Sequence, residues 1–383
     1  MELAGVGPSA GEEEPGYLSR QLITYIGNKR GLGAELERAV WRVRERVGGR
    51  RLVTLDLFAG SGFVARLLKR HSVVVMANDL EEYSRVVNSC FLADRDGRVA
   101  GRVAGVVDEL NRRADAGESV DGFIREMYSP QDDRDIGVGE RVFYTNDNAR
   151  RLDFFAQEIA RLDEPERVLV LGPLLSQASM HANTSGVFKG FYKDKNTGIG
   201  KFGAAAGDAL RRILEPIRLE APVLSLHAAR SVVTRSDANV LVGGMGVGGG
   251  VGEVDLTYID PPYNQHPYGS NYFMLNLLVD YKRPAVVSPV SGIPVDWNRS
   301  EYNVRKRSLG LLVNLLDRLP SRFILLSFNA EGYIGIEDLK LVLAARGSVD
   351  EIVIPYNTFR GGRNLRQRAI HVNEHLFLVD RMG

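Results

Sequence analysis

The four residues Asp260-Pro261-Pro262-Tyr263 combine groups that could bind and activate a ligand, and they follow the apolar run Val254–Ile259. That run is rich in β-branched residues, so we expect a buried strand. Two consecutive prolines must end the strand, because proline fixes φ and donates no backbone hydrogen bond. At the carboxyl end of a strand, where open α/β sheets bind ligands, the Asp260 carboxylate and the Pro261 carbonyl would be two acceptors beside the Tyr263 ring. This arrangement suits a flat ring with an exocyclic NH2 group; a plain Pro-Pro turn is the alternative.

A glycine-containing turn lies between a strand predicted at residues 52–58 and a helix predicted to end at Lys69. Asp56 and Phe58 belong to the end of the strand, and Gly60 and Gly62 allow a tight turn and a close approach of a ligand to the backbone. The turn lacks the third glycine of a dinucleotide-binding fingerprint and the Gly-Lys-Ser/Thr sequence of a P-loop.

The next predicted strand, residues 73–77, leads into Asn78 and Asp79. An acid at the tip of the second strand of such a unit can accept hydrogen bonds from both hydroxyls of a ribose. The glycine turn and Asp79 together describe a nucleoside pocket without a pyrophosphate cradle, which fits S-adenosylmethionine better than NAD or ATP. A βαβ unit that binds no ligand is the alternative.

Two further side chains are candidates for ligand contacts. Lys29 lies on a Gly-Asn turn before a helix predicted over residues 32–47, where it could hold a carboxylate or phosphate; a solvated turn is the alternative. Asp237 follows a sheet segment predicted at residues 222–228, and it could cap a helix or reach a ligand. The glycine-rich run at residues 243–252 is predicted to be a flexible loop.

From about residue 95 the alternating pattern stops, and polar, arginine-rich segments continue to about residue 216. We interpret residues 96–216 as an insertion into the α/β domain, with a strand at residues 167–171 and a helix near residues 204–214. Between these, residues 181–195 interleave aromatic, lysine and amide side chains, which could grip phosphates and touch bases; a surface loop is the alternative. The candidates for nucleic-acid contact there are Asn183, Thr184, Lys189 and Lys193.

Two later segments are also basic. One covers residues 297–307, and the other is a loop at 357–368 between two predicted antiparallel strands, residues 351–355 and 374–379. Clustered arginines can bind phosphates or simply form a solvated face, and the sequence leaves both open. The candidates for nucleic-acid contact here are Arg299, Arg305, Lys306, Arg360 and Arg363.

The composition bounds the class of protein. The chain has 383 residues, of which 44% are hydrophobic and 25% charged, as in an ordinary soluble globular protein. The net charge is only +1, so nucleic-acid contacts must come from local basic patches. The single cysteine, Cys90, excludes a disulfide framework and a cysteine-rich zinc site, and no metal is expected. Residues 1–16 are predicted to be a disordered tail without a signal peptide, and no apolar run reaches transmembrane length, so we expect a cytoplasmic protein.

The ordered set of motifs resembles the alpha-class, Dam-like N6-adenine DNA methyltransferases, particularly the modification enzymes of type IIS-like restriction systems. The motifs that carry the resemblance are Tyr25-Ile26-Gly27-Asn28-Lys29, Asp56-Leu57-Phe58-Ala59-Gly60-Ser61-Gly62, Asn78-Asp79 and Asp260-Pro261-Pro262-Tyr263. The resemblance implies a Rossmann-like α/β fold that binds S-adenosylmethionine, with a doubly wound sheet and a C-terminal antiparallel hairpin. Residues 17–95 and 217–383 would form this catalytic domain, and residues 96–216 an inserted target-recognition domain.

The resemblance also implies roles for residues. Tyr25, Lys29, Asp56, Phe58, Gly60, Gly62, Asp79 and Asp237 would bind the cofactor. Among them, Lys29 and the glycine turn would hold its methionine end, Asp79 its ribose, and Asp237 its adenine amino group. Asp260 to Tyr263 would activate the N6 of a flipped-out adenine for direct methyl transfer, with Tyr263 stacked on the base. The implied partner is double-stranded DNA, with a cognate restriction endonuclease as a candidate and a monomer as the default state.

Three other functions remain open from the sequence. Asp-Pro-Pro-Tyr corners also occur in methyltransferases that act on ribosomal RNA bases, so an RNA substrate is the main alternative. A nucleic-acid-binding protein without catalytic activity is a second. A fused nuclease is disfavoured, because Asp338-Leu339-Lys340 lacks an upstream acidic partner and lies in a predicted helix.

Overall fold

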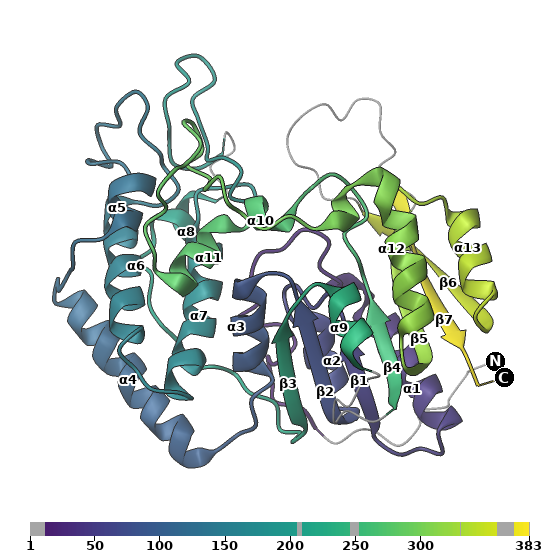
Figure 1. Cartoon of the computed structure of the whole chain (residues 1–383). Helices are drawn as coiled ribbons and strands as arrows, with labels where there is room; N and C mark the ends of the chain where they lie inside the picture. Colours follow the sequence, from purple (N-terminus) through teal and green to yellow (C-terminus); the bar gives the residue numbers. More distant parts are fainter. Residues whose placement is uncertain (1–11, 205–208, 246–252, 330, 358–370, 383) are drawn as a thin grey trace, which may run out of the picture.

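The computed structural model describes residues 12–204, 209–245, 253–329, 331–357 and 371–382, and its centre is a seven-stranded sheet (Figure 1). The strand order is β3-β2-β1-β4-β5-β7-β6, and β7 is antiparallel to both of its neighbours, whereas the other pairs are parallel. The strands are β1 (Leu52–Asp56), β2 (Ser72–Asp79), β3 (Arg230–Arg235), β4 (Val254–Ile259), β5 (Ser321–Asn329), β6 (Ser348–Asn357) and β7 (His371–Asp380).

The chain runs outward from β1 to β2 and β3 and then returns to the other side of β1 as β4. Strands β1 and β4 are therefore neighbours at a topological switch point, and their register pairs Asp56 with Tyr258. In open α/β sheets, ligands bind beyond the carboxyl ends of the strands at such a point. The sheet thus brings the ends of β1, β2 and β4 to one edge.

Helices cover both faces of the sheet, which confirms the doubly wound α/β architecture expected from the sequence. One face buries apolar side chains of α1 and α2, and the other buries those of α9, α12 and α13 against the sheet. These helices are α1 (Gly33–Arg46), α2 (Phe63–Lys69), α9 (Ala238–Met245), α12 (Arg305–Arg318) and α13 (Ile336–Ala344). In Figure 1, α12 and α13 lie over β5 and β6.

A block of helices follows α3 (Glu82–Phe91) and lies beyond β3, at one end of the sheet (Figure 1). Its first four helices, α4 to α7, share one apolar core with α3 and with α11. The block consists of α4 (Gly97–Asp115), α5 (Phe123–Tyr128), α6 (Asn146–Ile159), α7 (Glu166–His181) and α8 (Leu210–Leu214), and two helices from after β4, α10 (Tyr268–Asn271) and α11 (Phe273–Asp280), lie next to it.

Several local predictions were wrong. Residues 167–171 are part of α7, not a strand; this helix is buried on almost every side, so its apolar residues show no helical period. Residues 222–228 are not in the sheet, which resumes only at β3, and residues 243–245 complete α9. Residues 12–16, expected in the disordered tail, are partly fixed: the Glu13 carboxylate accepts hydrogen bonds from the Leu226 amide and the Ser225 hydroxyl.

The described residues contain neither a membrane-spanning helix nor a cluster of metal-binding side chains. Within the ranges that the structure covers, no helix is long and apolar enough to cross a bilayer. No group of three or more histidine, cysteine, aspartate or glutamate side chains could hold a metal ion in those same ranges.

Candidate active site at the carboxyl ends of the strands

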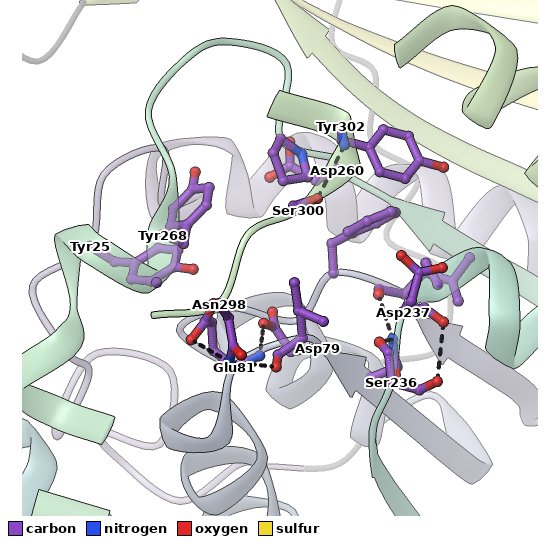
Figure 2. Close-up of a pocket in the computed structure, with 17 residues that line it drawn as sticks. Tyr25, Asp79, Glu81, Ser236, Asp237, Asp260, Tyr268, Asn298, Ser300 and Tyr302 are labelled. Atoms are coloured by element: carbon purple, nitrogen blue, oxygen red, sulfur yellow. Dashed lines mark hydrogen bonds between the residues drawn. The ribbon is translucent and has the colours of Figure 1, made fainter. Parts of the chain in front are cut away.

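A pocket opens at the carboxyl ends of β1 to β4, where the topology places it (Figure 2). The strand ends contribute Phe58, Asp79, Asp237 and Asp260 to its wall. The remaining wall comes from Tyr25, from the start of α10, and from a segment that leads into the 3-10 helix η2 (Glu301–Asn303). In Figure 2, Tyr25 and Tyr268 lie at one end of this pocket, and Asp237 and Tyr302 lie at the other.

The charged residues that line the pocket are all acidic. They are Asp79, Glu81, Asp237 and Asp260, and among the described lining residues there is no lysine or arginine. Burial raises the pKa of Glu81 to about 7 and also raises the pKa of Asp79. A pocket with this charge favours a ligand that carries positive charge, and it disfavours the phosphates of NAD or ATP.

The glycine turn after β1 is fixed by Asp79. Its Oδ2 accepts a hydrogen bond from the Gly60 amide at 2.8 Å, and its Oδ1 accepts one from the Glu81 amide at 2.9 Å. Gly60 and Gly62 have φ values of 47° and 79°, and a Cβ at Gly60 would lie 2.8 Å from the Tyr25 ring. Gly60 is therefore required where the Tyr25 ring crosses the turn, and the left-handed backbone of Gly62 also favours glycine.

Lys29 lies beneath the pocket wall, behind Asp260. Its ammonium is 2.9 Å from Asp260 Oδ2, 3.3 Å from Glu374 Oε1 and 3.0 Å from the Gly27 carbonyl. The Gly27 carbonyl accepts a hydrogen bond from the ammonium, and the two carboxylates form ion pairs with it. That Lys29 also holds the methionine end of a cofactor stays a prediction.

Asp260 has two unlike carboxylate oxygens. Oδ2 is bound to Lys29, whereas Oδ1 is buried and has no hydrogen-bond partner among the described residues. Burial raises the pKa of Asp260 to about 6, against the lowering effect of Lys29. Behind it, Asp56 is fully buried and does not line the pocket, and its pKa is raised by burial and by the nearby Asp260.

The other residues of the Pro-Pro corner surround Asp260. Pro262 lines the pocket and Pro261 is buried. Tyr263 is half-buried beside the pocket: its ring contacts Phe328 with the ring centroids 5.5 Å apart, and its hydroxyl accepts a hydrogen bond from Asn329 at 2.8 Å.

Aromatic side chains form both ends of the pocket. Tyr25 stacks with Tyr268 and Tyr272 at centroid distances of 5.1 and 4.7 Å. At the other end, the Phe58 ring meets Tyr302 edge to face at 5.4 Å. Asp237 lines this end and also caps α9, since its Oδ1 accepts hydrogen bonds from the amides of residues 239 and 240.

Among the lining residues that were not predicted as site residues from the sequence are Glu81, Tyr268, Asn298, Ser300 and Tyr302. Glu81 lies two residues after Asp79, so its position near a strand end was a usable signal. Asn298 donates hydrogen bonds to Glu81 and to the Leu80 carbonyl from a loop more than two hundred residues away, and no local pattern indicates such a contact.

The predicted nucleic-acid contacts fall into different environments. Asn183 is fully buried, and Thr184 is nearly so. Lys189 and Lys193 are exposed on the loop after α7, with the Lys193 ammonium 5.0 Å from the Phe191 ring centroid. Three more are exposed near η2 and α12, where Arg299 covers Trp297 and Arg305 covers Tyr333; they are Arg299, Arg305 and Lys306. Arg360 and Arg363 lie outside the described residues.

The structure gives Asn183 a structural role in place of the expected contact with DNA. Its amide nitrogen donates to the carbonyls of Val142 and Lys201, each at 2.8 Å, and its amide oxygen accepts from Gly203 at 2.9 Å. Both the amide nitrogen and the amide oxygen of Asn183 therefore form hydrogen bonds with main-chain groups. The prediction that it contacts bases stays untested, and the burial of its side chain does not support it. The sequence did not indicate this burial, because a polar residue type in a loop does not reveal whether it is buried.

We expect Asn183→Ala to lower the free energy of unfolding by about 2–4 kcal/mol, because three buried backbone groups would lose their partners. Chemical denaturation measures this change. Asn196→Ala, an exposed asparagine of the same loop, should stay within about 0.5 kcal/mol of the wild type. A variant at Asn183 with unchanged stability and weakened DNA binding would contradict the structural role.

Comparison with known proteins agrees with this site. Residues 25–198 match the family of D12 class N6 adenine-specific DNA methyltransferases. The type II methyltransferase M.NlaIII of Neisseria lactamica is 26% identical, over 94% of this chain and 99% of its own length. M.CviAII of Paramecium bursaria Chlorella virus 1 is also 26% identical, over 85% of this chain and 89% of its own. The modification methylase StsI of Streptococcus sanguinis has the same identity over 94% of this chain, which spans 52% of StsI.

The fold and these matches define a Rossmann-like methyltransferase. Over residues 25–198 the chain is similar to the D12 class of N6-adenine-specific DNA methyltransferases, and over most of its length it is similar to type II methyltransferases. It is accordingly an adenine-specific DNA methyltransferase.

Proposed function

We propose that this protein uses S-adenosylmethionine to methylate the N6 atom of an adenine within a specific sequence of duplex DNA. The observation that carries this proposal is the Asp260 carboxylate at the wall of an acid-lined pocket, with its buried Oδ1 left without a hydrogen-bond partner among the described residues. The names of the relatives, as type II or modification methylases, support a place in a restriction–modification system. In that case a cognate endonuclease would exist, and we infer a monomeric methyltransferase.

The residues present fit S-adenosylmethionine. The four lining carboxylates suit its sulfonium and ammonium charges. Asp79 and Glu81 would hold the ribose hydroxyls, Phe58 and Tyr302 would flank the adenine ring, and Asp237 would accept from its amino group. When bound, the cofactor supplies an electrophilic methyl group.

Asp260 would act on the substrate amine. Adenine N6 is a weak nucleophile because its lone pair is delocalised into the ring. An N6–H donated to Asp260 Oδ1, and the other N6–H donated to the Pro261 carbonyl, would favour a pyramidal nitrogen whose lone pair faces the methyl donor. Positioning and electrostatic stabilisation would then provide most of the rate enhancement, without a covalent enzyme intermediate.

The target adenine must leave the double helix to reach this corner, at a cost of a few kcal/mol. Stacking on the Tyr263 ring would recover about 1–3 kcal/mol. The hydrogen bond from Asn329 and the contact with Phe328 hold that ring in place before the base arrives. We propose that the helical block α4–α8, with the exposed Lys189 and Lys193, recognises the target, and that Arg299, Arg305 and Lys306 contact phosphates.

The proposal is tested by incubating the protein with methyl-labelled S-adenosylmethionine and either duplex DNA or ribosomal RNA, followed by nucleoside analysis. We expect N6-methyladenine in DNA at one recurring sequence. Label only in RNA would contradict the DNA substrate, and cofactor binding without any transfer would favour the catalytically silent alternative. Magnesium-dependent cleavage of DNA by the purified chain would show that methylation is not its only activity.

A further inference from the structure

We propose that Glu374 is a positioning residue for methyl transfer: through Lys29, it fixes the orientation of the Asp260 carboxylate and adds negative charge to the corner that the substrate meets. The inference rests on the proposed function. It concerns a residue that no sequence motif singled out, since Glu374 lies on the last described strand, far from every motif in the chain.

Glu374 occupies a position where an apolar residue would be expected. On β7, residues 374, 376 and 378 point to the same face of the sheet, and Leu376 and Leu378 are part of the apolar core there. Glu374 is only 4% exposed. A buried carboxylate costs free energy unless it is paired and hydrogen-bonded, so its presence in this row needs a specific reason.

The contacts of Glu374 supply that reason. Its Oε1 accepts a hydrogen bond from the Ser327 hydroxyl of β5 at 2.7 Å and lies 3.3 Å from the Lys29 ammonium. The main-chain pairing of Glu374 with Asn329 fixes the height of this carboxylate along the sheet. The side chain is therefore held from β5 and presented to Lys29.

The Lys29 ammonium lies among three acceptors. It donates a hydrogen bond to the Gly27 carbonyl and forms ion pairs with Glu374 Oε1 and Asp260 Oδ2, at 3.3 and 2.9 Å. Among the described residues, Asp260 Oδ1 has no hydrogen-bond partner. Without Glu374, the ammonium could turn about its flexible side chain, and the orientation of Asp260 would no longer be fixed.

Glu374 also sets the charge that the substrate meets. If Lys29 faced Asp260 alone, one positive charge would neutralise one negative charge, and the corner would stabilise positive charge on N6 only weakly. With two carboxylates on one ammonium, a net negative charge remains when both are ionised. The other titratable groups that face Asp260 are Asp56 of β1, Tyr258 of β4, Tyr263 of the corner and Tyr268 of α10.

The sign of the effect on Asp260 follows from these charges. Glu374 is one of the groups that raise the pKa of Asp260, which stands at about 6. Replacing it by glutamine removes this effect while keeping a side chain of the same shape that can still accept from Ser327. The pKa of Asp260 should then fall, so the acid limb of the pH–rate profile should move to lower pH.

The test is Glu374→Gln in the full chain, measured by single-turnover methyl transfer to DNA from pH 4.5 to 8.5 and by cofactor affinity. We expect transfer at pH 7.5 to slow about 10- to 100-fold, as for a misplaced reacting group, with cofactor affinity changed less than threefold. The acid limb should move downward. Glu351→Gln is the matched control, because Glu351 is a carboxylate of the neighbouring strand that pairs with His375 and Lys340 at the surface; its rate and profile should equal the wild type.

A 13C NMR titration of the Asp260 carboxyl measures the effect of Glu374 on the pKa of Asp260 without any turnover. The signal is assigned by its loss in Asp260→Asn. A lower pKa of Asp260 in Glu374→Gln supports the inference. Two outcomes would overturn it. One is a rate of methyl transfer and a pKa of Asp260 equal to those of the wild type. The other is a slower rate with no change in the acid limb of the pH–rate profile or in the pKa of Asp260. If the wild type methylates no DNA while the Asp260 signal still moves, the proposed function fails and the coupling through Lys29 stands.

Discussion

Replacing Asp260 with alanine should reduce methyl transfer by at least about 10²–10³-fold, the size of effect seen when one preorganised electrostatic contact is removed from an active site. The variant lacks the acceptor Oδ1 that would take the N6–H of adenine. Lys29 keeps two acceptors, Glu374 and the Gly27 carbonyl, so the fold of the corner should survive. Affinity for S-adenosylmethionine should change by no more than a few-fold, because the ribose and adenine contacts proposed for it lie elsewhere in the pocket.

Single-turnover transfer and calorimetric cofactor binding separate these two expectations. Asp317→Ala is the matched control: Asp317 pairs with Arg346 at the surface of α12, and its loss should leave the rate unchanged. Rapid transfer by Asp260→Ala would remove Asp260 from the mechanism. Loss of cofactor binding together with activity would instead place Asp260 among the cofactor contacts.

Replacing Lys29 with methionine should give the largest loss of stability, about 3–5 kcal/mol near pH 8, because it leaves buried carboxylates without their positive partner. Lys29 is 5% exposed, and both Asp260 and Glu374 contact its ammonium. Chemical denaturation at several pH values measures the change. Lys340→Met, which removes a half-exposed lysine that pairs with Glu337 and Glu351, should cost less than about 1 kcal/mol.

The loss of stability in Lys29→Met should depend on pH in one direction. Lys29 lowers the pKa of Asp260, so its removal should raise that pKa above its value of about 6. A carboxyl whose pKa is higher in the folded than in the unfolded protein favours folding below the unfolded pKa, about 4, and this contribution is lost as the pH rises through the folded pKa. The deficit relative to the wild type should therefore be smaller at pH 5 than at pH 8. An equal deficit at both values would contradict the charge argument.

The sequence predicted the parts of the fold that have strong local signals. Strand β4 ends at Ile259, and the two prolines follow after one intervening residue. Gly60 and Gly62 mark the turn between β1 and α2. These two signals located the edge of the sheet that carries the pocket. Residues 167–171 were assigned wrongly because a helix surrounded by other helices has no polar face. Strand β3 was placed too early because it is an edge strand with serine, threonine and arginine in it, whereas the apolar residues just before it lie outside the sheet.

The site was predictable where a residue ends a strand, as Asp79 does, or directly follows one, as Asp260 does. Contacts between distant segments were not, because nothing local records them. The position of Lys29 behind Asp260 depends on Glu374, and the burial of Asn183 depends on carbonyls at residues 142 and 201. The sequence held one usable signal for Glu374: it is a charged residue on a face of β7 whose next residues are leucines.

The place of β7 in the sheet has a consequence for synthesis of the protein. This strand follows all six others along the chain, yet it lies between β5 and β6. On the ribosome, the pocket-lining ends of β1, β2 and β4 therefore emerge well before the strand that carries Glu374. A nascent chain could fold its glycine turn and its helical block before β7 emerges. In such a chain Lys29 would pair with Asp260 but would still lack Glu374. Full methyltransferase activity would then appear only when β7 joins the sheet, so that incompletely synthesised chains would not methylate DNA.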